Sequence, residues 1–114
     1  MDYKEKTRFF ISLLEEKKLE NIYAVDVTDL TAEANTFIIA TARNDRQAGS
    51  VCEFIEEKAE EKGLYTIGKE GTDLARWILL DYGDIIIHLF LREERDYYNL
   101  ERLWQDGKVI KDDE

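Results

Sequence analysis

The sequence predicts one mixed α/β domain, an α/β or α+β fold in which helices flank a mixed β-sheet of about five strands. Two observations lead to this prediction. Short β-branched or apolar runs, typical of strands, alternate with longer segments in which apolar residues recur at helical spacing. The chain has 114 residues, of which 44% are hydrophobic and 37% are charged, a balance typical of a single folded domain.

The N-terminal region is expected to form a helix followed by two strands. Residues 2–18 carry one apolar stripe at helical spacing, which predicts the helix. The β-branched run 22–27 and the apolar run 37–41 predict the strands. A polar, turn-prone stretch, residues 28–35, separates them.

The second helix is expected to begin at Asn44 or Asp45, either of which can cap it, and to end at Gly63. Glutamates cover its outer face, which we interpret as solvated rather than as a binding site. Cys52 lies on its apolar face. We interpret this cysteine as a small buried hydrophobic residue, because no obvious base is near enough to activate it as a nucleophile.

The C-terminal half is expected to add three strands and a helix. Residues 64–67 suggest a short strand, and the glycines that follow, Gly68 and Gly71, predict a flexible stretch. Strands at 77–81 and 85–90 are joined by a short turn, which indicates an antiparallel hairpin. The second of these strands is apolar on both faces, so it is expected to be central in the sheet. A helix at 93–104 and a frayed polar tail at 107–114 complete the chain.

The charge of the chain favours some partners over others. The formal net charge is −10 at pH 7, so free nucleic acid and an anionic membrane surface are poor partners. A basic protein suits such a chain better, although the acidity could also serve solubility alone. The one cysteine excludes an internal disulfide, and the first 14 residues lack a long apolar core. A cytoplasmic location is therefore expected.

Few residues suggest catalysis. Asp81 and Asp84 flank the Tyr82-Gly83 turn and could hold Mg²⁺ for nucleotidyl or phosphoryl transfer. The interpretation we favour is that both carboxylates shape the turn. His88, the one histidine, could be a general base, but we favour a hydrogen-bonded histidine in a core or an interface. No catalytic residue, metal or cofactor is predicted.

Trp77 begins the predicted hairpin and shares a strand face with Leu79 and Asp81. Tryptophan is common both in cores and at the centres of protein interfaces. The sequence pattern leaves both locations open for Trp77.

The segment 77–90, WILLDYGDIIIHLF, resembles the signature of the Iojap-like ribosomal silencing factors. Residues 94–104 resemble the closing helix of that family, and the resemblance spans about residues 6–104. Shorter similar segments lie upstream in the expected order, namely 24–27, 37–41, Arg46-Gln47 and Glu70-Gly71. We therefore assign residues 1–106 to one domain of this kind and residues 107–114 to a polar tail.

The resemblance implies a fold similar to a nucleotidyltransferase core, a homodimer, and no established catalytic activity or cofactor. It further implies binding to the large ribosomal subunit through ribosomal protein L-fourteen, which blocks subunit joining and represses translation. The expected partner-binding residues are Trp77, Leu79, Asp81, Tyr82, Asp84 and His88. Two departures from the family pattern are Asn35, near a position that is often Asp, and Ala42-Arg43, in place of a turn rich in small residues.

Overall fold

The fold is built on one mixed β-sheet, seen in a computed structural model that describes residues 1–113. Within these residues the sheet has six strands in the order β3-β4-β5-β2-β1-β6. Strands β2 and β5 are parallel, and the other neighbouring pairs are antiparallel. The elements in chain order are α1 (Tyr3–Glu16), β1 (Glu20–Asp26), β2 (Thr36–Ala42), α2 (Asp45–Glu61), β3 (Gly68–Glu70), β4 (Trp77–Asp81), β5 (Ile85–Leu91), α3 (Arg92–Tyr98), α4 (Leu100–Leu103) and β6 (Lys108–Asp112). The predicted mixed fold is confirmed, with one strand more than expected.

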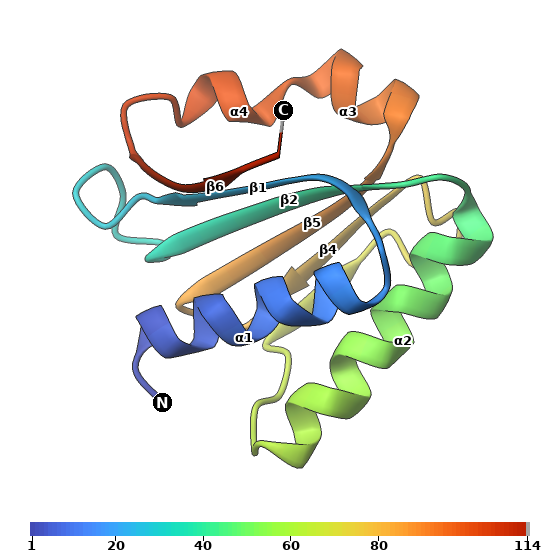
Figure 1. Cartoon of the computed structure of the whole chain (residues 1–114), viewed down its shortest axis with the longest axis horizontal. Coiled ribbons are helices and arrows are strands. Elements are labelled where there is room, and N and C mark those ends of the chain that lie inside the picture. Colours follow the sequence, from blue (N-terminus) through green and yellow to red (C-terminus); the bar gives the residue numbers. More distant parts are fainter. Residues whose placement is uncertain (114) are drawn as a thin grey trace.

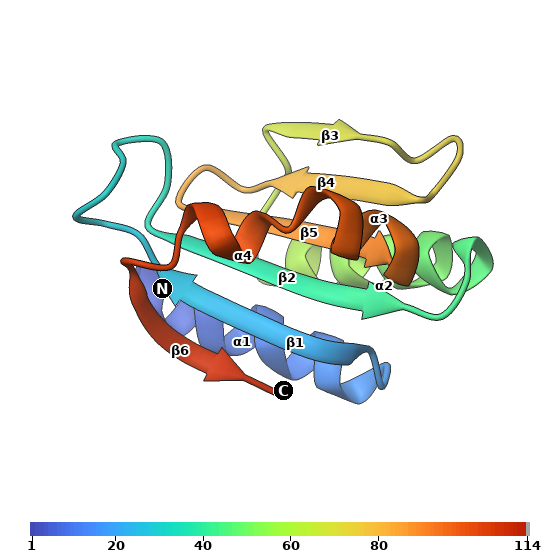
Figure 2. The same cartoon turned by 90° about the horizontal axis from the view of Figure 1, so that it is seen from above.

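Helices cover the two faces of the sheet unequally. Helices α1 and α2 lie on one face, and α3 and α4 lie on the other (Figure 1). The larger core lies under α1 and α2 and includes Phe10, Leu14, Ile55 and Ile87. Seen from above, α3 and α4 lie over β5 and β2 and leave most of β3 and β4 uncovered (Figure 2). No helix formed by the described residues therefore covers this face of β4 along most of its length (Figure 2).

Local sequence signals account for both long helices. Asp2 and Glu5 form a reciprocal capping box at the start of α1, which satisfies two backbone N–H groups. The Asn44 side chain accepts a hydrogen bond of 2.8 Å from the backbone N–H of Gln47 at the start of α2, as expected for an N-cap. Strand β5 lies between β4 and β2, which confirms the predicted central strand and the predicted hairpin.

The predicted last helix is wrong as a single element. Asn99 adopts a left-handed conformation with φ 47° and divides the segment into α3 and α4. Arg95, buried at the end of α3, donates to the Thr41 hydroxyl at 2.8 Å and to the Asn21 carbonyl oxygen, and pairs with Glu101 at 3.3 Å. A helix continued without a break would carry Glu101 away from this arginine, so the buried guanidinium accounts for the bend.

One predicted strand and the predicted tail are also wrong. The short strand lies at Gly68–Glu70 rather than at 64–67, because Gly68 pairs with Asp81 and Glu70 with Leu79 along β4. The predicted frayed tail instead forms β6, which pairs with β1. Without β6, the backbone groups along that side of β1 would form an unpaired edge. Glu114, the last residue of the predicted tail, lies outside the described residues.

Candidate partner-binding face

Strand β4 presents alternate side chains to the two faces of the sheet. Ile78 and Leu80 are fully buried in the core under α1 and α2. Trp77, Leu79 and Asp81 point to the opposite face and are half-buried. Ile86 of β5, opposite Asp81 in the register, is half-buried on the same face. We call Trp77, Leu79, Asp81 and Ile86 the β4 face.

Trp77 is held in place by other aromatic side chains. Its ring stacks on Phe90 with centroids 4.8 Å apart and lies 4.6 Å from the ring of Tyr98. Its Nε1–H donates a hydrogen bond of 3.0 Å to Nδ1 of His88, which confirms the expectation of a hydrogen-bonded histidine. The indole is therefore a rigid group with one side against the sheet and part of its surface exposed.

His88 is neutral at physiological pH. Burial lowers the pKa of its imidazole to about 4. Its Nδ1 accepts from Trp77, so the neutral ring carries its proton on Nε2. Only 7% of the residue is exposed, and its role in this arrangement is to orient Trp77.

The carboxylates of the predicted acidic turn are both used inside the fold. Oδ1 of Asp81 accepts a 2.8 Å hydrogen bond from the backbone N–H of Gly83, whose φ of +89° closes the turn. Oδ2 of Asp84 pairs with Nζ of Lys6 on α1 at 2.9 Å. The turn-shaping interpretation is confirmed for Asp81, while the Asp84 carboxylate joins the hairpin to α1 instead. Among residues 1–113, no group of three or more His, Cys, Asp or Glu side chains is placed to hold a metal ion.

Tyr82 lies on the other side of the sheet from Trp77. It is 8% exposed, and its ring centroid is 4.6 Å from that of Phe10 in α1. The same burial raises the pKa of its hydroxyl. A partner on the β4 face would not reach this ring, so the structure separates Tyr82 from the other predicted binding residues.

The sequence prediction missed two apolar residues of this region. Ile86 was read as part of an apolar run buried on both faces, but its side chain is only half-buried. Ile67 was placed in a strand, but it is 75% exposed beside the Tyr82-Gly83 turn, and its backbone N–H bonds to the carbonyl of Asp81. Ile67 lies between the turn that ends α2 and strand β3, and no local sequence pattern marks its side chain as exposed.

Two other sequence expectations can be compared with the structure. Cys52 is buried, as predicted, and burial raises the pKa of its thiol to about 12, which leaves it unreactive at neutral pH. None of the helices formed by residues 1–113 has the length and apolar character needed to cross a membrane.

The fold and the site define a small α/β domain with one partly exposed aromatic and aliphatic strand face. A family model described as "Ribosomal silencing factor during starvation" matches residues 1–114, and the chain belongs to this family. The chain is 36% identical over 109 residues to the ribosomal silencing factor RsfS of Bacillus subtilis, covering 96% of this chain and 92% of the relative. It is 30% identical to the chloroplastic protein Iojap of Zea mays, of which the match covers 49%, against 96% of this chain.

Solved structures show the same fold. A crystal structure of a Chromobacterium violaceum protein, 33% identical, superposes with a TM-score of 0.89 over 92% of this chain and 88% of that chain. A Bacillus halodurans structure, 29% identical, gives 0.83 over 95% and 98%. The Iojap-like resemblance inferred from the hairpin signature is thereby confirmed.

Proposed function

We propose that this chain binds the large ribosomal subunit through ribosomal protein L-fourteen and sterically blocks subunit joining, which represses translation. The observation that carries the proposal is the β4 face, in a member of the ribosomal silencing factor family. Trp77 and Leu79 supply apolar contact area, and Asp81 supplies a negative charge beside them. Such a combination suits the centre of a protein interface with a basic partner.

The rigidity of Trp77 supports its role as an anchor. The hydrogen bond to His88 and the stack on Phe90 fix the indole before any partner arrives. A side chain that is already ordered loses little conformational entropy on binding, so more of its contact energy appears as affinity. The net charge of −10 adds a long-range attraction to a basic ribosomal protein.

The proposed mechanism is steric and needs no catalysis. Asp81 and Asp84, which the alternative nucleotidyl- or phosphoryl-transfer function would use, are occupied by Gly83 and Lys6. His88 faces Trp77 rather than an open cleft. We propose in addition, from the family resemblance, that the protein is a homodimer and acts in the cytoplasm.

Two substitutions on the β4 face test the proposal with little effect on the fold. Leu79→Lys replaces a half-buried leucine by a cation that repels a basic partner. Asp81→Asn removes the charge but keeps an oxygen that can accept from Gly83. Each variant is expected to bind purified large subunits at least tenfold more weakly, about 1.4 kcal/mol, in co-sedimentation at low salt. Each should also permit more subunit joining in a light-scattering assay.

The matched controls lie in the loop between β1 and β2, where Leu30→Lys and Asp29→Asn make the same chemical changes at exposed positions. These controls are expected to bind as the unmodified protein does. The proposal fails if the unmodified protein does not sediment with large subunits at low salt. It also fails if the β4-face variants bind as tightly as the controls.

A further inference from the structure

A basic hollow lies between the end of α1 and the start of α2, in a protein whose net charge is −10. The hollow has a volume of about 560 Å³. Four cations line it: Lys17, Lys18, Arg43 and Arg46. Glu16 is the one acidic side chain in its wall. We call these four cations with their hollow the α1–α2 basic hollow.

The four cations are available to an external anion. All four residues are exposed, and within residues 1–113 none has a carboxylate oxygen within 4.0 Å. Lys17 lies over the ring of Phe54 at 4.3 Å, a contact that leaves its charge unneutralised. Unpaired cations gathered from separate segments give a local positive potential that the net charge of the chain conceals.

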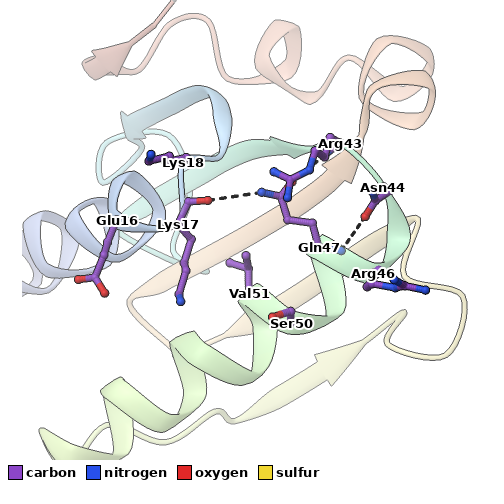
Figure 3. A pocket seen from close by; sticks show the side chains of 9 residues that line it. All are labelled: Glu16, Lys17, Lys18, Arg43, Asn44, Arg46, Gln47, Ser50 and Val51. Carbon is purple, nitrogen blue, oxygen red and sulfur yellow. Dashed lines mark hydrogen bonds between the residues drawn. The ribbon is translucent and has the colours of Figure 1, made fainter.

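Gln47 holds the two walls of the hollow together. Its Nε2 donates to the carbonyl of Lys17 at 3.4 Å, and its Oε1 accepts from the backbone N–H of Arg43 at 2.8 Å. One side chain thus fixes the spacing between the wall that carries Lys17 and the wall that carries Arg43 (Figure 3). Gln47 therefore positions the backbone segments that carry Lys17 and Arg43 relative to each other.

The arrangement of the cations favours an extended anion over a compact one. The labelled cationic side chains point to different sides of Gln47 and do not converge on one point (Figure 3). A single phosphate would need several donors aimed at the same place, whereas successive phosphates of a strand suit cations that are spread out. The unpaired arginines add donors that match phosphate oxygens.

The hollow lies at the end of the sheet that carries Trp77. Arg43 follows β2, whose last residue Ala42 pairs with Leu91, and Trp77 pairs with the adjacent Phe90. The hollow lies on the side of the sheet that carries α1 and α2, and the β4 face lies on the other side (Figure 1). A partner much larger than this domain would reach both by wrapping around the end of the sheet that they share. We propose that the α1–α2 basic hollow binds the phosphate backbone of an RNA strand on the large ribosomal subunit, an inference that rests on the proposed function.

The test uses the double variant Arg43→Gln/Arg46→Gln, which removes two exposed charges. Lys58→Gln/Lys62→Gln, near the other end of α2, makes the same change in net charge away from the hollow. Affinity for purified large subunits is measured over a range of KCl concentrations. Each lost phosphate contact reduces the slope of log affinity against log salt, so the Arg43/Arg46 variant is expected to flatten that slope by about 1.5. The Lys58/Lys62 variant is expected to keep the original slope.

A second measurement separates this inference from the proposed function. Fluorescence anisotropy with a short labelled single-stranded RNA at low salt is expected to show binding that the Arg43/Arg46 variant loses and the Lys58/Lys62 variant keeps. Failure of the unmodified protein to bind large subunits would sink the proposed function and the large subunit as the source of the RNA, whereas an intact RNA result would still support the hollow as a binding site for an RNA strand. The RNA inference is overturned if the Arg43/Arg46 variant keeps the subunit salt slope, or if both variants change it equally. It is also overturned if ATP binds the hollow as tightly as the RNA does.

Discussion

Replacing His88 by glutamine is expected to remove a pH-dependent part of the stability of the fold. Burial holds the pKa of His88 at about 4, below its ordinary value of 6.5. Between these two values the unfolded chain binds a proton at this position and the folded chain does not. The stabilising effect is therefore complete above about pH 6.5 and is lost progressively as the pH falls toward 4.

The size of the effect follows from the two pKa values. For a shift from 6.5 to about 4, the free energy of unfolding falls by about 2 kcal/mol between pH 7 and pH 5, and by about 3 kcal/mol at pH 4. Glutamine has no titrating group, yet its side-chain oxygen can still accept from Nε1 of Trp77. The contribution of His88 is thus the part of the pH dependence that the His88→Gln variant lacks.

Urea unfolding of both proteins, followed by tryptophan fluorescence at several pH values from 7 to 4, measures this difference. All other titrating groups are common to the two proteins and cancel in the comparison. The difference in free energy of unfolding between the unmodified protein and the His88→Gln variant should shrink as the pH falls from 7 to 4. The reason is that only the unmodified protein loses the stability that depends on a neutral His88. Stability curves that stay parallel from pH 7 to pH 4 would refute the reasoning.

Three further substitutions test how the fold positions the site. Gly71→Ala is expected to cost about 2–4 kcal/mol, because its φ is +80° and the new Cβ would lie 1.9 Å from the carbonyl oxygen of Trp77. Gly49→Ala, in the interior of α2 with open space around it, should instead raise the free energy of unfolding by about 0.5–1 kcal/mol. Equal urea midpoints for the Gly71→Ala and Gly49→Ala variants would contradict this expectation. Arg95→Lys is expected to cost about 2 kcal/mol in the same assay, because a lysine cannot reproduce the forked contacts to Thr41 and neighbouring groups. An unchanged midpoint for this variant would remove Arg95 as the cause of the bend at the end of α3.

Much of the fold could be predicted because its signals are local. The apolar spacing of α1 and α2, the caps at Asp2 and Asn44, and the doubly apolar run of β5 depend only on neighbouring residues. Strand β6 and the break at Asn99 could not be predicted in this way. The first depends on pairing with β1, and the second on a buried arginine that contacts residues more than fifty positions away.

The candidate site divides in the same way. Alternation along a strand was enough to place Trp77, Leu79 and Asp81 on one face, and the hairpin signature was enough to indicate the family. Whether that face is open depends on where α3 and α4 lie, which is a property of packing that no local pattern records.

By itself, the sequence determined a small acidic α/β domain of the silencing factor family, because periodicity, capping and a long ungapped signature are properties of consecutive residues. Only the tertiary structure decided which residues face outward. It turned Tyr82 into the core, left the β4 face uncovered, and brought Lys17 and Arg43 from separate segments to one basic hollow. The physical reason is that burial and local electric potential depend on distances in space, which the fold sets. A net charge is a sum over the whole chain and does not record where the charges lie.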